Sequence, residues 1–345
     1  MVLSPDQALN SGRWVKWIGG ASNQDLAAIE DLAGLYTLAG VHCLDLAADP
    51  AVVAAARRGI AWACSRGAAR PWLMVSLSDG ADPHFRKAWF DPSRCPADCP
   101  RPCARACPAL AINAAGVAAP RCYGCGRCLP ACPLGLIEER AQILEAEAVP
   151  ELLSALRPDA VELHTRLGRA AAFARRLEQL MASGVPLQRI AVSCGLEPSA
   201  APGALASELW DRFRQLRAVG ARPLWQLDGR PMSGDLGSGT AHAAVRLLRQ
   251  VAAEAPPGPL QLAGGTNART LGLVERPGVP GVAGVAFGGV ARSLLQPLLL
   301  EAQARGHRLL EDPQLGPRAE AIARGLVQPW LQRGGMAAGS APAGR

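Results

Sequence analysis

Short apolar runs of six or seven residues alternate along the chain with longer segments whose apolar positions recur every three to four residues. The runs at 14–20 and 42–47 are followed by periodic segments at 24–40 and 50–63. Short apolar runs bounded by glycine and proline favour strands, whereas the longer periodic segments favour helices. The beginning of the chain therefore predicts a strand, a helix, a strand and a helix, in that order.

Local signals support the boundaries of these two helices. Asp49 stands where an N-cap acceptor is expected, and Pro50 occupies the first helical position, which needs no N–H donor. Gly40 follows the first helix and can adopt the left-handed conformation that ends many helices.

The alternation resumes after a gap and gives eight strand–helix units. Strands separated by helices must be parallel, because the crossover returns the chain to the same edge. Eight units predict an α/β protein with a closed, TIM-like (β/α)8 barrel, and an open doubly wound sheet is the alternative. The remaining predicted strands are 71–77, 160–165, 189–194, 222–228, 260–265 and 284–289, and the remaining helices lie near 147–156, at 169–183, 203–219 and 239–254, after Asn267 and from near Arg292.

Residues 80–140 interrupt the alternation where the loop after the third strand is expected. A loop of this length without structure of its own is uncommon, so the segment is predicted to be an inserted domain. The barrel is then formed by 13–79 and 141–310. Residues 311–345 form a C-terminal extension, and its end, 334–345, is predicted to be disordered because it is rich in glycine and alanine.

Eight of the eleven cysteines lie in this insert, and the second four have the C-x2-C-x2-C-x3-C-P spacing of bacterial ferredoxins. Two-residue gaps let three thiolates surround one corner of an iron–sulfur cube, and the fourth cysteine of such a run binds the other cluster in two-cluster ferredoxins. Glycines between the cysteines allow the tight backbone. The residues of this motif are Cys122, Cys125, Cys128, Cys132 and Pro133, with Gly124 and Gly126 between them.

The first four cysteines, Cys95, Cys99, Cys103 and Cys107, recur at a step of four, which on a helix would place them on one face. Three prolines within 95–107 exclude a continuous helix, because proline lacks the N–H donor and restricts the residue before it. The step of four therefore means that three residues separate each cysteine from the next. In the ferredoxin pattern only two residues separate each of the first three cysteines from the next.

An internal repeat connects the two groups, since "CPALAI" at 107–112 matches "CPLGLI" at 132–137. A duplicated segment predicts an α+β, ferredoxin-like insert with two [4Fe–4S] clusters bound in the crossed manner. A tetrahedral zinc site in the first group is the alternative. The predicted ligands are Cys95, Cys99, Cys103 and Cys132 for one cluster, and Cys107, Cys122, Cys125 and Cys128 for the other.

The net charge of +7 does not indicate nucleic-acid binding, because the basic residues are almost all arginines scattered along predicted helices. No apolar run is long enough for a membrane span, and the first residues lack the pattern of a signal peptide. These features predict a cytoplasmic protein whose cysteines act as ligands rather than in disulfides. Cys43, Cys64 and Cys194 are predicted to be buried and free, with Cys194 facing the barrel mouth.

Two glycine pairs, Gly264–Gly265 and Gly288–Gly289, end the seventh and eighth strands, where barrels commonly bind a phosphate through backbone N–H groups. With Asn267 they form a predicted cofactor-binding site for a flavin or another phosphate-bearing ligand. The catalytic candidates at the predicted mouth are His164, Asp228, Arg230 and Asp235, accompanied by Ser22, Asp49 and Gln226. For each of them a structural role in a turn or in the core is the alternative.

The stretches "KWIGGASNQDL", "WQLDGRPMSGDLGSGTAHAA" and "QLAGGTN", together with the cysteine insert, resemble the cyanobacterial light-dependent period (LdpA) family over roughly residues 13–305. The resemblance implies an iron–sulfur protein that passes redox state, and so light intensity, to the circadian clock. It also implies clock-associated proteins or redox carriers as partners. Only the role of the insert cysteines as cluster ligands can be carried over to this chain, because the family offers no established catalytic residues.

Two functions remain open at this point. The first is a redox sensor that feeds light and redox state to the clock. The second is an oxidoreductase, in which the ferredoxin-like insert feeds electrons to a barrel that holds a phosphate-bearing or flavin-type ligand. The sequence does not decide whether the chain is an enzyme.

Overall fold

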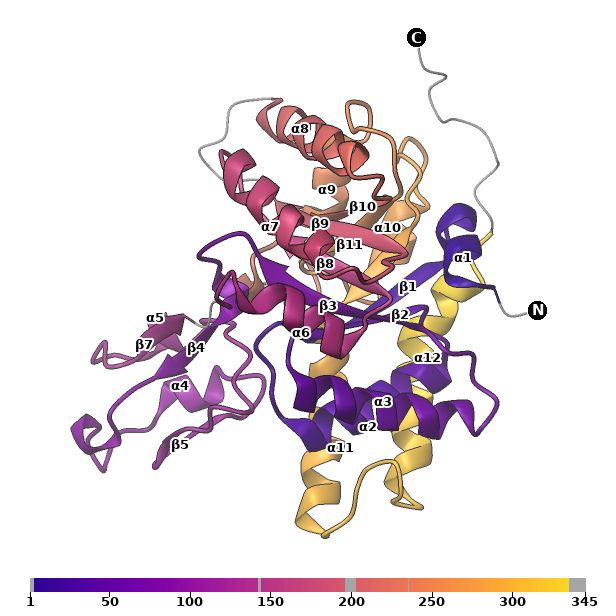
Figure 1. Ribbon diagram of the computed structural model, residues 1–345. Coiled ribbons are helices and arrows are strands. Elements are labelled where there is room, and N and C mark those ends of the chain that lie inside the picture. Colours follow the sequence, from indigo (N-terminus) through magenta and orange to yellow (C-terminus); the bar gives the residue numbers. More distant parts are fainter. Residues whose placement is uncertain (1–2, 142–143, 196–202, 235, 335–345) are drawn as a thin grey trace.

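The computed structural model describes residues 3–141, 144–195, 203–234 and 236–334 (Figure 1). Eight parallel strands close a barrel in the order β1-β12-β11-β10-β9-β8-β3-β2. The closed order confirms the predicted barrel and excludes the open sheet. The strands are β1 (Trp14–Gly20), β2 (Cys43–Ala47), β3 (Trp72–Ser78), β8 (Ala160–His164), β9 (Arg189–Gly195), β10 (Pro223–Asp228), β11 (Leu260–Ala263) and β12 (Gly284–Phe287).

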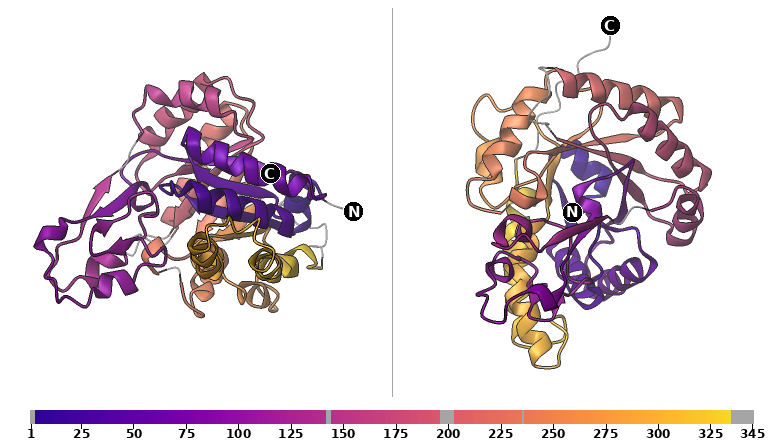
Figure 2. Two further views of the ribbon diagram at one scale, coloured as in Figure 1. Left: turned by 90° about the horizontal axis from the view of Figure 1, so that it is seen from below. Right: turned by 90° about the vertical axis from the view of Figure 1, so that its left-hand side faces the viewer.

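Helices surround the strands (Figure 2). Asp49 caps one of them by accepting hydrogen bonds from the N–H groups of Ala51 and Val52, and Gly40 ends another with a φ of 98°, so both predicted boundaries are confirmed. The last predicted helix begins at Gly289 rather than near Arg292. These helices are α2 (Leu26–Ala39), α3 (Pro50–Cys64), α6 (Ala148–Leu156), α7 (Ala170–Ala182), α8 (Ala204–Ala218), α9 (Ala241–Val251), α10 (Thr270–Val274) and α11 (Gly289–Ala304).

An apolar layer closes the barrel at the amino ends of its strands. Trp14, Met74 and Leu224 meet there, and helix α1 (Pro5–Ser11) covers them with Leu9. The sequence interpretation did not include α1. Its packing under the strands leaves the opposite, carboxyl end of the barrel as the end that can open to ligands.

The C-terminal extension is a packed part of the fold. Helix α12 (Leu315–Leu331) buries Trp330 and contacts α2 and β1. Its end is joined to the start of β1, because Arg13 Nε donates to the Arg333 carbonyl at 2.8 Å and Arg333 Nη1 donates to the Gly12 carbonyl at 3.1 Å. The predicted disorder of 334–345 falls almost wholly outside the described residues.

Residues 80–140, here called the cysteine segment, lie between β3 and β8, which are neighbours in the barrel. The segment projects from the end opposite α1 (Figure 1) and has its own apolar cluster around the cysteines. Antiparallel β4 and β7 pair, and so do β5 and β6. Its elements are η1 (Pro83–Phe85), β4 (Arg86–Trp89), η2 (Pro92–Arg94), α4 (Pro102–Arg105), β5 (Ile112–Asn113), β6 (Gly116–Val117), α5 (Cys128–Ala131) and β7 (Glu138–Ala141).

Polar contacts dock the cysteine segment on the barrel. Lys87 Nζ donates to Gln24 Oε1 at 2.6 Å and to the Ala119 carbonyl at 2.7 Å, and the Gln24 N–H donates to the Pro120 carbonyl at 3.0 Å. Because Lys87 is buried, these contacts replace water around its charge. Among the described helices, none is long and apolar enough to cross a membrane.

Candidate functional site

Four cysteines surround one small cavity of about 330 Å³ in the cysteine segment, and they are the set predicted for the second cluster. All four are buried, and two of their sulfur atoms accept backbone hydrogen bonds: Cys122 Sγ from the Ala88 N–H and Cys107 Sγ from the Ala111 N–H, both at 3.3 Å. N–H groups bonded to sulfur are common around the cysteine ligands of iron–sulfur clusters. At Cys107 burial outweighs these donors and raises the pKa of the thiol. The set is Cys107, Cys122, Cys125 and Cys128.

The other four cysteines line a second cavity of about 340 Å³, together with Phe90 and Ile137. Burial opposes the charged form of Cys132, but N–H groups of the following loop, first among them that of Leu136, outweigh it and lower the pKa of this thiol. This set is Cys95, Cys99, Cys103 and Cys132, the one predicted for the first cluster.

Each cysteine run therefore contributes its fourth member to the cavity formed by the other run. Cys107 ends the first run but lines the cavity of about 330 Å³ with the second run, and Cys132 ends the second run but lines the cavity of about 340 Å³ with the first. The two short helices that carry Cys103 and Cys128, α4 and α5, pack against each other and bring the runs together. Pro102 occupies the first position of α4, so the region that looked helical contains a single turn.

Gly124 and Gly126 have the positive φ values expected of the tight loop between the cysteines, 76° and 73°. A Cβ atom at Gly124 would lie 2.3 Å from the carbonyl oxygen of Arg86. Both conformation and close approach therefore require glycine here.

The sulfur atoms of the cysteine segment are not placed as a single zinc ion would hold them. With Zn–S bonds of about 2.3 Å, tetrahedral geometry places the sulfurs about 3.8 Å apart. Within the described ranges, which contain all eight cysteines of the segment, no three of their sulfur atoms lie within 4.8 Å of one another.

A layer of polar side chains fills the barrel above its apolar floor. Lys16 is fully buried; its Nζ lies 2.8 Å from Asp45 Oδ2 and forms a second ion pair with Glu162. Gln226 Nε2 donates to Glu162 Oε1 at 2.7 Å, and Gln261 Nε2 donates to Gln226 Oε1 at 2.7 Å. The network makes a rigid polar base for whatever binds above it.

The charged groups of this network shift one another's pKa values. Burial and the nearby Glu162 outweigh Lys16 and raise the pKa of Asp45. Burial alone would raise the pKa of Glu162 as well, but the charges of Lys16 and His164 hold it below its usual range. Burial disfavours protonated His164, but the hydrogen bond and charge of Glu162 and the charge of Asp82 raise its pKa to about 9.

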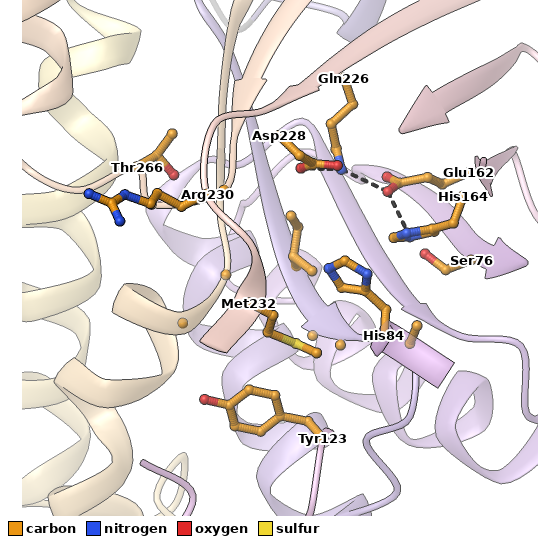
Figure 3. A pocket seen from close by; sticks show the side chains of 18 of the residues that line it. Ser76, His84, Tyr123, Glu162, His164, Gln226, Asp228, Arg230, Met232 and Thr266 are labelled. Atoms are coloured by element: carbon orange, nitrogen blue, oxygen red, sulfur yellow. Dashed lines mark hydrogen bonds and ion pairs between the residues drawn. The ribbon is translucent and has the colours of Figure 1, made fainter. Parts of the chain in front are cut away.

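A pocket of about 740 Å³, partly open to solvent, occupies the barrel mouth above this layer (Figure 3). One wall carries His164, Glu162 and Asp228, and burial raises the pKa of Asp228. His84 and Tyr123 reach the same pocket from the cysteine segment. The pocket is therefore formed jointly by the barrel and the cysteine segment.

The opposite wall has the features of an anion site. It contains both glycine pairs and Thr266, beside the N-terminus of α11, which no side chain caps. Arg292, 4% exposed, donates to the Gly19 carbonyl, and its guanidinium lies 5.0 Å from the ring centre of Tyr123. In the described part of the chain, no carboxylate lies within 4.0 Å of this cation, so an anionic ligand there would meet a buried charge without a direct ion pair.

Most of the sequence candidates come together at this mouth. His164, Asp228 and Arg230 line the pocket with Gly264, Gly265, Gly288 and Gly289, although the Arg230 side chain is exposed. Asp235 lies outside the described residues. Asn267 does not line the pocket: its Nδ2 donates to the Gly237 carbonyl at 3.0 Å, and its Oδ1 accepts the Arg269 N–H, so it fixes the loop before α10.

The other candidates have structural surroundings. Ser22 Oγ donates to the His84 carbonyl at 2.5 Å, and Asp49 caps α3. Cys43 is buried and free as predicted, whereas Cys64 is only partly buried, and the side chain of Cys194 lies outside what is described.

Several residues of the pocket and of the polar layer beneath it were missed from the sequence: Glu162, His84 and Arg292 line the pocket, and Lys16 and Asp45 belong to the layer. Three of them are charged residues in the middle of apolar strands. That exception to the strand pattern was an available signal, since a charge inside a buried strand must find a partner.

Comparison with known proteins identifies relatives over nearly the whole chain. The family model described as the LdpA Fe-S cluster-binding domain matches residues 95–143, and that of the light dependent period A C-terminal domain matches residues 152–329. A curated protein named "Light dependent period A", from Synechococcus elongatus, is 49% identical over 348 residues, covering 98% of this chain and 97% of the relative.

Solved structures resemble the chain more distantly. The carboxyl transferase domain of Rhizobium etli pyruvate carboxylase matches with a TM-score of 0.46 and 13% identity, over 99% of this chain and 52% of that one. The (S)-3-O-geranylgeranylglyceryl phosphate synthase of Thermoplasma acidophilum matches with a TM-score of 0.39 and 10% identity, over 94% and 96% of the two chains. This chain thus spans about half the length of the first structure.

Proposed function

This chain belongs to the light dependent period A family, and we propose that it is a redox sensor whose two [4Fe–4S] clusters pass light conditions to the circadian clock. The family match makes it an iron–sulfur protein. The number of clusters, their type and the sensing role form the proposal.

The division of the eight cysteines into two quartets supports two clusters most directly. Each quartet lines its own cavity, and the exchange of Cys107 and Cys132 between the runs is the arrangement of two-cluster ferredoxins. The ferredoxin-like character of residues 80–140 rests on the same exchange and on the repeated sequence.

The two quartets differ in their access to solvent, which supports different roles. Cys95, Cys99 and Cys132 are partly exposed, whereas the other quartet is buried against the barrel. Leu134, 53% exposed, lies beside Cys132 and offers an apolar contact to a redox carrier or a clock-associated protein. In this proposal the outer cluster exchanges electrons with carriers.

A complementation experiment tests this function. In Synechococcus elongatus cells that lack their own relative, this chain is expected to restore the dependence of the circadian period on light intensity. The Cys125→Ser variant is expected to fail, because it removes a ligand of the inner cluster. The period is measured with a luminescent clock reporter at several light intensities.

The matched control is Cys64→Ser, which changes a free cysteine of the barrel and is expected to behave like the unchanged chain. Protein levels of all variants are compared by immunoblot. Equal restoration by Cys125→Ser, at equal protein level, would contradict a sensing role for that cluster.

A second candidate function is an oxidoreductase acting on a phosphate-bearing or flavin-type ligand. One specific observation favours it: Tyr123 lines both the mouth pocket and the cavity of the inner quartet. An inner cluster would therefore lie next to a ligand in the mouth, where electrons could pass between them. The glycine pairs and Arg292 supply the anion-binding wall that such a ligand requires.

Mass spectrometry of ligands released from protein purified without oxygen tests this candidate. A phosphate- or carboxylate-bearing molecule is expected at near one per chain. It is expected to be lost from Arg292→Met and retained in Arg246→Met, which changes an arginine not among the residues that line the pocket. Release of no such molecule from the unchanged protein would count against the oxidoreductase.

A further inference from the structure

Three potential metal ligands meet at the barrel mouth, apart from the cysteine cavities. Asp82 Oδ1 lies 2.7 Å from His84 Nδ1 and 4.0 Å from His164 Nδ1, and the two imidazole rings are 4.6 Å apart. Among the described residues, this is the one group of three or more carboxylate, imidazole or thiol ligands whose ligand atoms all lie within 4.8 Å of one another.

The fold brings the three residues together from two places. Asp82 and His84 lie on either side of Pro83 in the first turn after β3, where Asp82 Oδ1 accepts the His84 N–H at 2.8 Å and fixes the loop. His164 ends β8, and β8 pairs with β3 so that His164 lies opposite Ser78. The site therefore joins the cysteine segment to the barrel.

The surroundings of His164 are those of a metal-binding histidine. Its Nε2 lies 3.0 Å from Glu162 Oε1, and Glu162 is held in turn by Lys16 and Gln226. A histidine that binds metal through one ring nitrogen commonly donates the other N–H to a carboxylate, which fixes its orientation. Figure 3 shows the contact of His164 with Glu162. That contact leaves Nδ1, which lies 4.0 Å from Asp82 Oδ1, available as a ligand.

The charge around the group also favours a cation. Asp82, Glu162 and Asp228 face the two histidines, and Lys16, which pairs with Glu162, is shared between Glu162 and Asp45. Arg166 approaches Asp82 only to 4.0 Å and is largely exposed. A divalent ion held by these side chains would place positive charge among the three carboxylates, where it would be balanced by them.

The donor set indicates the kind of ion. Cis ligands around an ion with bonds of about 2.1 Å lie about 3.0 Å apart, close to the shorter of the two distances from Asp82. Two imidazoles and one carboxylate, with coordination positions left open, are typical of iron(II) and of similar first-row ions. The pocket beside the group leaves room for water or for a ligand at those positions.

We propose that Asp82, His84 and His164 bind a divalent ion of the Mn²⁺ and Fe²⁺ class at the barrel mouth. The bound ion faces the pocket and shares it with any anionic ligand held near Arg292. This site uses none of the cluster cysteines, so its failure would leave the proposed clock function intact.

Mn²⁺ binding to the protein with its clusters intact tests the proposal. Free Mn²⁺ gives a six-line electron paramagnetic resonance signal that weakens on binding, and Mn²⁺ has little affinity for any cysteines that have lost iron. We expect the unchanged protein to bind about one Mn²⁺ per chain. His84→Gln and Asp82→Asn are each expected to weaken this binding at least tenfold while the cluster absorbance persists.

His307→Gln is the matched control, because His307 Nδ1 lies 3.5 Å from Asp312 Oδ2 at the surface, a histidine–aspartate pair without a third ligand. This variant is expected to bind Mn²⁺ like the unchanged protein. Absence of binding by the unchanged protein at 1 mM Mn²⁺, or undiminished binding by His84→Gln, would overturn the proposal and leave the three residues as a group held by hydrogen bonds and ion pairs alone.

Discussion

Replacement of Lys16 by methionine is expected to lower the free energy of unfolding by about 3–5 kcal/mol. The ammonium group of Lys16 is fully buried and balances Asp45 and Glu162, so its removal leaves two carboxylates in the barrel without a cation. Methionine fills similar space, and the loss therefore reports the missing charge rather than a cavity. Urea unfolding followed by the fluorescence of the buried tryptophans Trp14 and Trp17 measures it.

The loss of stability in Lys16→Met is also expected to depend on pH. Without Lys16, the buried carboxylates have pKa values above those of the unfolded chain, so the folded variant binds more protons than the unfolded one. Its stability then falls as pH rises through the folded pKa values, and the loss should be larger at pH 8 than at pH 5.5.

Two controls separate this effect from a general loss of a cation. Arg324→Met breaks an exposed pair with Glu320 and is expected to cost no more than about 0.5 kcal/mol. Adding Asp45→Asn and Glu162→Gln to Lys16→Met is expected to recover much of the stability, because neither carboxylate that Lys16 balances is then charged. A loss in Lys16→Met as small as that of Arg324→Met would show that water reaches the carboxylates.

Loss of one cysteine ligand is expected to remove one cluster, and pairs of variants reveal which cysteines share it. Cys132→Ala, Cys95→Ala and Cys128→Ala should each lower the iron content from about eight to about four atoms per chain. Crossed binding predicts that Cys95→Ala adds no further loss to Cys132→Ala, because both line the same cavity. It also predicts that Cys128→Ala combined with Cys132→Ala removes nearly all iron.

If each run of four cysteines bound its own cluster instead, Cys95→Ala combined with Cys132→Ala would remove nearly all iron, and Cys128→Ala would add no further loss to Cys132→Ala. One pair of measurements therefore decides between the two arrangements. Iron and acid-labile sulfide are assayed after reconstitution without oxygen, together with the absorbance near 400 nm. Cys64→Ala should retain the full content, because that cysteine lies in the barrel. A colourless protein that contains zinc instead would contradict both arrangements.

The barrel could be predicted from sequence because its strands are short apolar runs buried on both faces, between helices with clear periods. The cysteine quartets could be predicted because their spacing is local and their crossing follows a known pattern. A charge inside an apolar strand signals that Lys16, Asp45 and Glu162 each need a partner, but their pairing could not be predicted, because the three strands meet only when the barrel closes. His84 lies in the first turn after β3 and meets His164 only because β3 pairs with β8, and α1 and α12 became evident only from their packing.

The adjacency of the first and last strands has a consequence for the order of events during synthesis. β1 pairs with β12, where Trp14 lies opposite Gly284, so the barrel cannot close before most of the chain has been made. Cys132, the last of the cluster cysteines, precedes Gly284 by about 150 residues. At about 5–20 residues per second, that interval lasts about 8–30 s. All eight cysteines are therefore synthesised well before the barrel can close, which allows iron loading to precede completion of the fold.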